Sequence, residues 1–174
     1  KSTENRLEFI YKTIYGKLIK EGYATHSSRD DIIKYTGIKP EVKGIINSIR
    51  RKKGKEKRSY GLGFQLKHVQ YPTGDIEIIP NIEIDQEVTG IDVFAFQGAI
   101  QEYFNNNKTG LTALVESSSF RSSERGFTPK NTALIRIPFS LEEIVHESKK
   151  EDLLAKLKES TYHLFRAVDN ILIL

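Results

Sequence analysis

The stretch "SSRDDIIKYTGIKPEVKGIINSIRRKKGK" (residues 27–55) decides the predicted fold of this chain. Ser28 is a natural N-cap for a short helix over residues 29–35, and Gly37 can adopt the left-handed conformation that ends such a helix. Pro40 suits the first turn of a second helix, which we expect over residues 40–53. Four apolar residues of this second helix recur at i, i+3, i+4 and i+7, namely Val42, Ile45, Ile46 and Ile49. The pattern predicts two helices joined by a tight turn.

The face of the second helix opposite this apolar stripe is basic and lacks acidic residues. It carries Lys43, Gly44, Asn47, Ser48, Arg50 and Arg51, and Lys52 continues the basic run. In the major groove Arg pairs bidentately with guanine and Asn with adenine, while Lys and Ser hold phosphates. We therefore predict DNA contacts for Lys43, Asn47, Ser48, Arg50, Arg51 and Lys52. Glu41, at the start of this helix, would either read cytosine or repel a phosphate.

The flanking residues extend this pattern in both directions. Before it, "RLEFIYKTIYGKLIK" (residues 6–20) places Leu7, Ile10, Tyr11, Ile14 and Leu18 on one side of a predicted helix. After it, residues 64–79 contain two β-rich runs around the turn sequence "PTGD" (residues 72–75). The expected order is thus three helices followed by a two-stranded ribbon.

On these residues, the region from 3 to about 82 resembles a winged helix-turn-helix DNA-binding domain. The resemblance implies that the helix over residues 40–53 enters the major groove of double-stranded DNA. It also implies that residues 64–79 form the wing, on which Lys67 and His68 would contact the DNA. The alternative interpretation of His68 is an ordinary exposed strand residue.

The charge is divided unevenly along the chain. Residues 1–70 contain 17 Lys/Arg and 7 Asp/Glu, whereas residues 71–174 contain 10 Lys/Arg and 16 Asp/Glu. A basic half of this kind is typical of a polyanion-binding surface. The change of sign predicts a boundary between residues 80 and 90. We expect a winged-helix domain over residues 1–82 and an α/β domain over residues 83–174.

The C-terminal half mixes helix and strand signals. Residues 90–104 predict a strand or buried turn that runs into a helix, and residues 111–119 and 132–139 look like strands. Between these two strands, the Ser-rich residues 117–131 predict a polar loop, in which Arg121, Arg125 and Lys130 could meet a phosphate backbone. Ser140 and Glu143 have the spacing of a capping box. A long amphipathic helix follows from residue 150, and the predicted fold class is α+β.

Two carboxylates in this half suggest a catalytic alternative. Asp92, in "TGIDVFAF", and Glu116, in "TALVESSSF", resemble a degenerate PD-(D/E)xK nuclease core. The resemblance implies that both carboxylates would bind Mg²⁺ and catalyse DNA cleavage. Ser118 stands where that core has a lysine. Further acids alternate along an extended stretch, namely Asp75, Glu77, Glu83, Asp85 and Glu87. Of these, Glu83, Asp85 and Glu87 would share one face of a strand. The other interpretation of all these acids is solvent-facing charge.

Other chemistries find little support in the sequence. The chain has no Cys, so it has no disulfide and no thiolate ligand or nucleophile. Its four His residues show no paired-ligand spacing, and no glycine-rich phosphate loop is present. No apolar run is long enough to span a bilayer. The sequence predicts a cytoplasmic protein with no membrane association and no cofactor, or with Mg²⁺ if it is a nuclease.

Three functions remain open at this point. The first is a sequence-specific DNA-binding protein, such as a transcription regulator or replication factor, that acts as a homodimer. The second is a Mg²⁺-dependent site-specific endonuclease in which the winged helix reads the sequence and Asp92 and Glu116 cut. The third is a winged helix used only for protein assembly.

Overall fold

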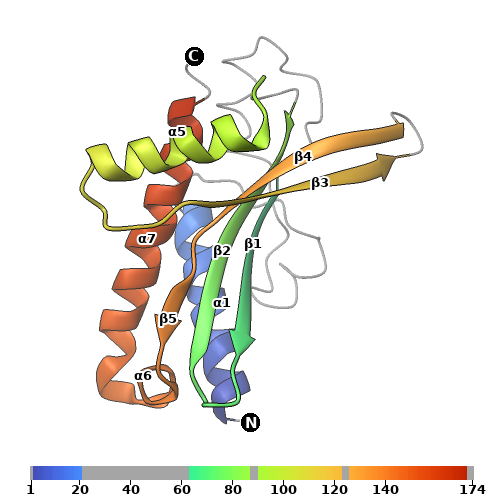
Figure 1. Cartoon of the computed structure of the whole chain (residues 1–174). Helices are drawn as coiled ribbons and strands as arrows, with labels where there is room; N and C mark the ends of the chain where they lie inside the picture. The colour runs from blue at the N-terminus through green and yellow to red at the C-terminus, as the bar shows by residue number, and fades with distance from the viewer. Residues whose placement is uncertain (1, 21–62, 87–89, 123–125, 172–174) are drawn as a thin grey trace.

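The fold is a strongly twisted antiparallel sheet with long helices packed against it (Figure 1). A computed structural model describes residues 2–20, 63–86, 90–122 and 126–171. The elements in chain order are α1 (Ser2–Lys20), β1 (Gly63–Gln70), β2 (Ile76–Asp85), α5 (Val93–Asn106), β3 (Leu114–Ser122), β4 (Gly126–Leu134), β5 (Ile137–Phe139), α6 (Leu141–Val145), a 3-10 turn (Glu147–Lys149) and α7 (Lys150–Ile171). The predicted mixed class of helices and strands is therefore confirmed for these residues.

Helix α1 confirms the helix predicted over residues 6–20 and begins four residues earlier. Its buried positions are Leu7, Ile10, Tyr11, Ile14 and Tyr15. They recur at the spacing that places side chains on one side of a helix, and they face the sheet. The predicted helices over residues 29–35 and 40–53 lie outside the described residues, so the winged helix itself stays a prediction.

The ribbon predicted over residues 64–79 is present as the β1–β2 hairpin. Its strands pair from Gly63 opposite Glu83 to Gln70 opposite Ile76, and the turn includes the predicted "PTGD" residues. β2 also pairs along its other edge with β4 and with β5. The hairpin is thus one side of a five-stranded sheet of order β1-β2-β4-β3, with β5 added beside β2.

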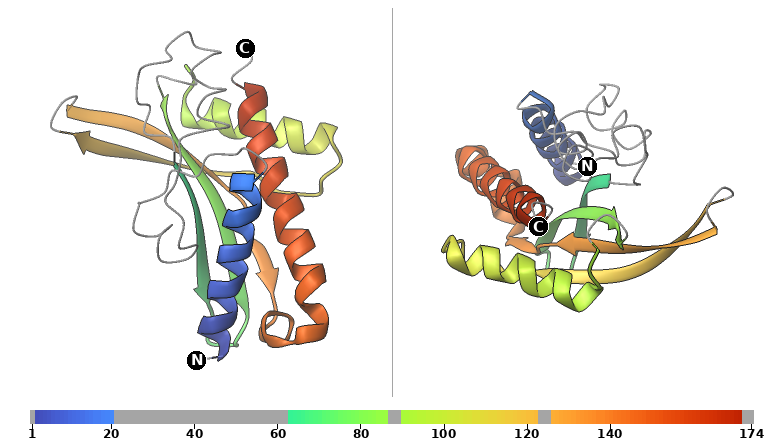
Figure 2. Two further views of the ribbon diagram at one scale, coloured as in Figure 1. Left: turned by 180° about the vertical axis from the view of Figure 1, so that it is seen from behind. Right: turned by 90° about the horizontal axis from the view of Figure 1, so that it is seen from above.

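The prediction of a polar loop over residues 117–131 is wrong. β3 and β4 pair through this region from Leu114 opposite Leu134 to Ser122 opposite Gly126. The prediction treated serine as a loop signal, but strand propensity depends strongly on context, and continuous pairing with a neighbour satisfies the backbone of a polar strand. Figures 1 and 2 show this hairpin extending well beyond the helices.

One face of the sheet forms the core with α1, α5 and α7. Phe64 of β1 lies between Tyr15 of α1 and Phe165 of α7, with ring centroids 5.8 Å and 5.0 Å away. Helix α5 lies near the start of β3 and contacts α7 through buried Phe96, Ile100 and Phe104. Figure 2 shows α1 and α7 side by side over the sheet. A single buried cluster therefore extends from Leu7 to Ile171.

The predicted domain boundary near residue 82 falls within β2. The described residues before and after this position share one sheet and one hydrophobic cluster. The division into a winged-helix domain over residues 1–82 and an α/β domain over residues 83–174 stays a prediction.

The predicted helix starts of the C-terminal half are confirmed. The Ser140 hydroxyl accepts a hydrogen bond from the Glu143 amide (3.1 Å), and the Glu143 carboxylate accepts one from the Ser140 amide (2.9 Å). These reciprocal bonds form a capping box at the start of α6. The long amphipathic helix is α7, which buries Leu153, Leu154, Leu157, Leu164 and Phe165. Within the described ranges, no helix combines the length and apolar character needed to cross a membrane.

Candidate functional site

The predicted major-groove residues belong to the segment between α1 and β1. Lys43, Asn47, Ser48, Arg50, Arg51 and Lys52 all lie outside the described residues. The structure instead shows where this segment, residues 21–62, leaves and rejoins the fold. α1 and β1 run antiparallel, because Tyr11 contacts His68 whereas Tyr15 contacts Phe64 and Leu66. The end of α1 and the start of β1 therefore lie at the same end of the molecule.

A buried hydrogen bond holds this junction together. The Leu66 amide donates to the Tyr15 hydroxyl at 3.0 Å, and both residues are buried. Since a buried amide without a partner is costly, the bond fixes the start of β1 against α1. The 42 residues between Lys20 and Gly63 are thus attached to a rigid pair of elements at both ends.

The two predicted wing residues point to opposite faces of β1, because they are adjacent in a strand. Lys67 is exposed on the face away from α1 and makes no ion pair with the described residues. His68 faces α1, where its Nδ1 and the Tyr11 hydroxyl share a hydrogen bond of 2.6 Å. Partial burial lowers the pKa of His68 below its ordinary value of 6.5. His68 therefore has a structural contact in α1, and its role toward DNA stays a prediction.

Asp92 caps a helix in this structure. Its Oδ1 accepts a hydrogen bond from the Ala95 amide at 2.9 Å, which satisfies a free donor at the start of α5. The neighbouring Ile91 carbonyl accepts a hydrogen bond from the Asn131 side chain of β4 (3.3 Å). Asn131 also accepts a hydrogen bond from Gln86 Nε2 at 3.1 Å. Asn131 is fully buried and ties the start of α5 to the sheet.

Glu116 points to the other face of the sheet. In β3 it stands opposite Thr132, whereas the next residue, Ser117, stands opposite Asn131. Side chains alternate along a strand, so Glu116 is directed away from the face on which Asn131 holds the Asp92 segment. Within residues 2–20, 63–86, 90–122 and 126–171, no group of three or more His, Asp or Glu side chains is arranged to hold a metal ion. The Mg²⁺ role of Asp92 and Glu116 stays a prediction.

The other predicted charges are partly paired. Glu83 Oε1 lies 3.4 Å from Nζ of Lys130, whose side chain is almost fully buried. Lys130, one of the predicted phosphate contacts, is thus engaged with Glu83. Glu87 lies outside the described residues, and the side chains of Arg121 and Arg125 belong to the undescribed part of the β3–β4 hairpin.

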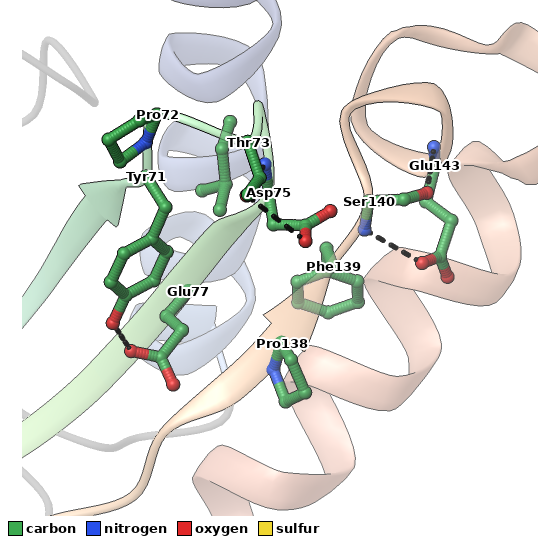
Figure 3. Close-up of a pocket in the computed structure, with 10 residues that line it drawn as sticks. Tyr71, Pro72, Thr73, Asp75, Glu77, Pro138, Phe139, Ser140 and Glu143 are labelled. Carbon is green, nitrogen blue, oxygen red and sulfur yellow. Dashed lines mark hydrogen bonds between the residues drawn. The ribbon is translucent and has the colours of Figure 1, made fainter.

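The structure also contains a surface hollow that the sequence patterns did not indicate. It has a volume of about 650 Å³ and lies between the β1–β2 turn, β5 and α6 (Figure 3). Its lining residues are Tyr71, Pro72, Thr73, Asp75, Ile76, Glu77, Pro138, Phe139, Ser140 and Glu143. The lining contains three carboxylates and no Lys, Arg or His. Because the turn and β5 are about 65 residues apart in the chain, only their pairing in the sheet brings this set together.

Each carboxylate of the hollow has one oxygen engaged. Glu77 Oε1 accepts a hydrogen bond from the Tyr71 hydroxyl and lies 3.4 Å from Arg136 Nη1. The hydrogen bond to Glu77 raises the pKa of Tyr71 above its ordinary value of 10.0. Asp75 Oδ2 accepts from the Thr73 hydroxyl at 3.3 Å, and Glu143 Oε1 accepts from the Ser140 amide. Figure 3 shows Tyr71 and Glu77 on one side, Glu143 on the other and Asp75 between them.

Comparisons with known proteins do not identify a family. No protein-family model, no curated protein and no solved structure matches this chain.

Proposed function

We propose that the protein is a sequence-specific binder of double-stranded DNA, acting as a homodimeric transcription regulator or replication factor. The helix expected over residues 40–53 would read the major groove through Lys43, Asn47 and Arg51, with Ser48, Arg50 and Lys52 beside them. Lys67 would add a phosphate contact from β1.

The observation that carries this proposal is the concentration of positive charge in one segment. Residues 21–62 contain 11 Lys/Arg and 5 Asp/Glu, whereas the rest of the chain contains 16 Lys/Arg and 18 Asp/Glu. Within that segment, residues 50–58 include seven Lys/Arg and one acid. Lys and Arg clustered in one region supply the phosphate contacts that dominate affinity for DNA.

The attachment of the segment supports the proposal. Both of its ends join the α1–β1 pair at the same end of the molecule, where the Tyr15–Leu66 hydrogen bond fixes the two elements. A DNA-reading element works best when a rigid scaffold sets its orientation. The described residues on either side of the basic segment are thus held together at one end of the fold.

The test is a titration of a labelled random duplex followed by fluorescence anisotropy at several salt concentrations. The wild type should bind with an affinity that falls steeply with salt. Lys43→Ala/Asn47→Ala/Arg51→Ala should lower the affinity on the order of a hundredfold or more, and should reduce the slope of log K against log salt by about 2.

The matched control removes the same number of positive charges elsewhere. Ser148→Ala/Lys149→Ala/Lys156→Ala changes exposed residues next to and within α7 and should leave the affinity within about twofold. No binding by the wild type at low salt, or equal loss in both triple variants, would refute the proposal and favour a role in protein assembly.

The endonuclease alternative rests on the resemblance around Asp92 and Glu116 alone. In the described residues Asp92 is used as a helix cap, and Glu116 points to the other face of the sheet. We therefore place DNA binding first. Incubation of supercoiled DNA with the wild type and Mg²⁺ separates the two functions, because only the nuclease would produce nicked or linear product.

A further inference from the structure

The hollow between the β1–β2 turn and α6 is suited to a cationic ligand. Its lining residues include Asp75, Glu77 and Glu143 but no basic residue, in a chain whose net charge is +4. Asp75 Oδ1, Glu77 Oε2 and Glu143 Oε2 have no hydrogen-bond partner among the described residues. Each of these carboxylates therefore keeps one acceptor oxygen, and Figure 3 shows Asp75 lying between Glu77 and Glu143.

The apolar part of the hollow selects among cations. Ile76 and Phe139 are buried at its base, and Tyr71, Pro72 and Pro138 form exposed walls. A metal ion would gain nothing from these walls, whereas a side chain with an aliphatic stem and a charged head uses both kinds of surface. The planar guanidinium group of arginine can also stack on the Tyr71 ring and donate to a carboxylate in a bidentate manner, which a lysine ammonium cannot do.

The openness of the hollow argues for a peptide rather than a small molecule. Tyr71, Pro72, Thr73 and Asp75 are all exposed around it. Sites for small molecules usually enclose most of the ligand, which this hollow does not. A peptide gains further contacts outside the hollow, so it can bind where an isolated cation is held weakly.

We propose that this hollow binds an arginine side chain presented by a basic peptide segment of a partner protein. Glu77 and Asp75 receive the guanidinium group, and Tyr71 and the two prolines contact the stem. The proposal does not depend on DNA binding, because the hollow lies at the turn end of β1 and residues 21–62 rejoin the fold at the start of β1.

Arg136 forms an ion pair with Glu77 and so provides a second variant for the test. Its Nη1 is 3.4 Å from Glu77 Oε1, so it neutralises part of the negative charge that the incoming cation needs. Replacing Arg136 with a neutral residue should therefore strengthen the binding of a cation and weaken the binding of an anion. The two variants Glu77→Gln and Arg136→Gln have opposite expected effects on a cationic ligand.

The experiment uses the full chain and three probes. The first is the acetylated peptide Gly-Arg-Gly-Arg-Gly with an amidated C-terminus, the second is the same peptide with citrulline in place of arginine, and the third is argininamide. Binding is followed by amide chemical-shift changes in the ¹⁵N spectrum at near-physiological salt. The arginine peptide should shift the amides of residues 71–77 and 138–143 with a Kd in the millimolar range or below.

The variants should change that Kd in a defined order. Glu77→Gln should weaken binding about threefold, and Arg136→Gln should tighten it about as much, as expected for exposed ion pairs. Glu116→Gln, which removes the same charge from an exposed site on β3, should leave the Kd unchanged. The amide spectrum of each variant also reports whether the fold is intact.

Three outcomes would overturn the binding of an arginine side chain in the hollow. These are equal binding of the citrulline peptide, weaker binding by Arg136→Gln, and the same Kd for wild type and Glu77→Gln. Argininamide that binds as tightly as the peptide would reject a peptide partner and indicate a small cationic ligand instead.

Discussion

The two hairpins of the sheet differ in the residues that their strands contain. In β1–β2, Phe64, Leu66, Ile78 and Ile82 fill the face that packs on α1 and α7. In the outer part of β3, four of the six residues from 117 to 122 are serine, and Figure 1 shows this part of the hairpin extending beyond the helices. Side-chain burial stabilises the first hairpin, whereas the outer part of the second is defined by its strand pairing, from Ser118 opposite Lys130 to Ser122 opposite Gly126. The comparison can be tested by removing one interaction at a time.

The largest effect on stability should come from Phe64, near the start of β1 in the first hairpin. Phe64→Ala removes the ring that lies between Tyr15 and Phe165 and leaves a cavity in the core. We expect the free energy of unfolding to fall by about 3–5 kcal/mol. Urea unfolding followed by circular dichroism measures this. Lys67→Ala, on the opposite face of the same strand, should change it by less than about 0.5 kcal/mol, and similar losses in both variants would contradict the comparison.

The second effect concerns the inner end of the second hairpin. Asn131→Ala removes, from a fully buried position, the side chain that donates to the Ile91 carbonyl and accepts from Gln86. The expected loss is about 2–3 kcal/mol by urea unfolding. Ser117→Ala, at the exposed position opposite Asn131 in the ladder, is the matched control and should be nearly neutral. A neutral Asn131→Ala would mean that α5 does not depend on this attachment.

The third prediction isolates one hydrogen bond at the junction of α1 and β1. Tyr15→Phe keeps the ring but leaves the buried Leu66 amide without the hydroxyl acceptor. We expect a loss of about 1–2 kcal/mol. Tyr71→Phe removes an exposed hydroxyl that bonds Glu77 and should cost much less. Hydrogen exchange provides a second measurement, because the Leu66 amide should lose protection in Tyr15→Phe and keep it in Tyr71→Phe.

A smaller effect on the free energy of unfolding is expected from the protonation of His68 in β1. Partial burial lowers the pKa of His68, so the folded state binds the proton less readily than the unfolded state. The stability linked to His68 is therefore complete above pH 6.5 and is lost as the pH falls below that value. The midpoint of urea unfolding should fall more between pH 7.5 and pH 5.5 in the wild type than in His68→Gln. An equal fall in the midpoint of both proteins would show that protonation of His68 does not change the free energy of unfolding.

The same contrast explains which parts of the fold the sequence could predict. The spacing of Leu7, Ile10, Tyr11 and Ile14 is a local pattern, and so is the alternation around the "PTGD" turn, so α1 and β1–β2 were predictable. The capping box at Ser140 and Glu143 has a similarly local signal. The strands expected over residues 111–119 and 132–139 cover only the inner ends of β3–β4. Its outer part was missed because those residues have no apolar alternation, and the sequence alone does not show which residues pair.

The residues of the candidate sites also differ in whether a local sequence pattern indicates their role. Asp92 follows a Gly-Ile pair and precedes an apolar helix, so its role as an N-cap could have been recognised from spacing to Ala95. The hollow around Glu77 had no such signal, because Tyr71, Glu77 and Phe139 meet only through the pairing of β2 with β5. Long-range strand pairing is the information that local patterns do not contain.

The smallest effect on stability is expected from Glu116→Gln, in the second hairpin. Glu116 is exposed opposite Thr132, and within the described residues it forms no ion pair. The free energy of unfolding should change by less than about 0.5 kcal/mol. This neutrality makes the variant useful for function, because any loss of Mg²⁺-dependent DNA cleavage could not be attributed to unfolding. If the wild type cuts supercoiled DNA and Glu116→Gln does not, the carboxylate acts in catalysis and the endonuclease alternative replaces our proposal. If neither protein cuts while the wild type binds the duplex, Glu116 is an ordinary surface charge and the DNA-binding proposal stands.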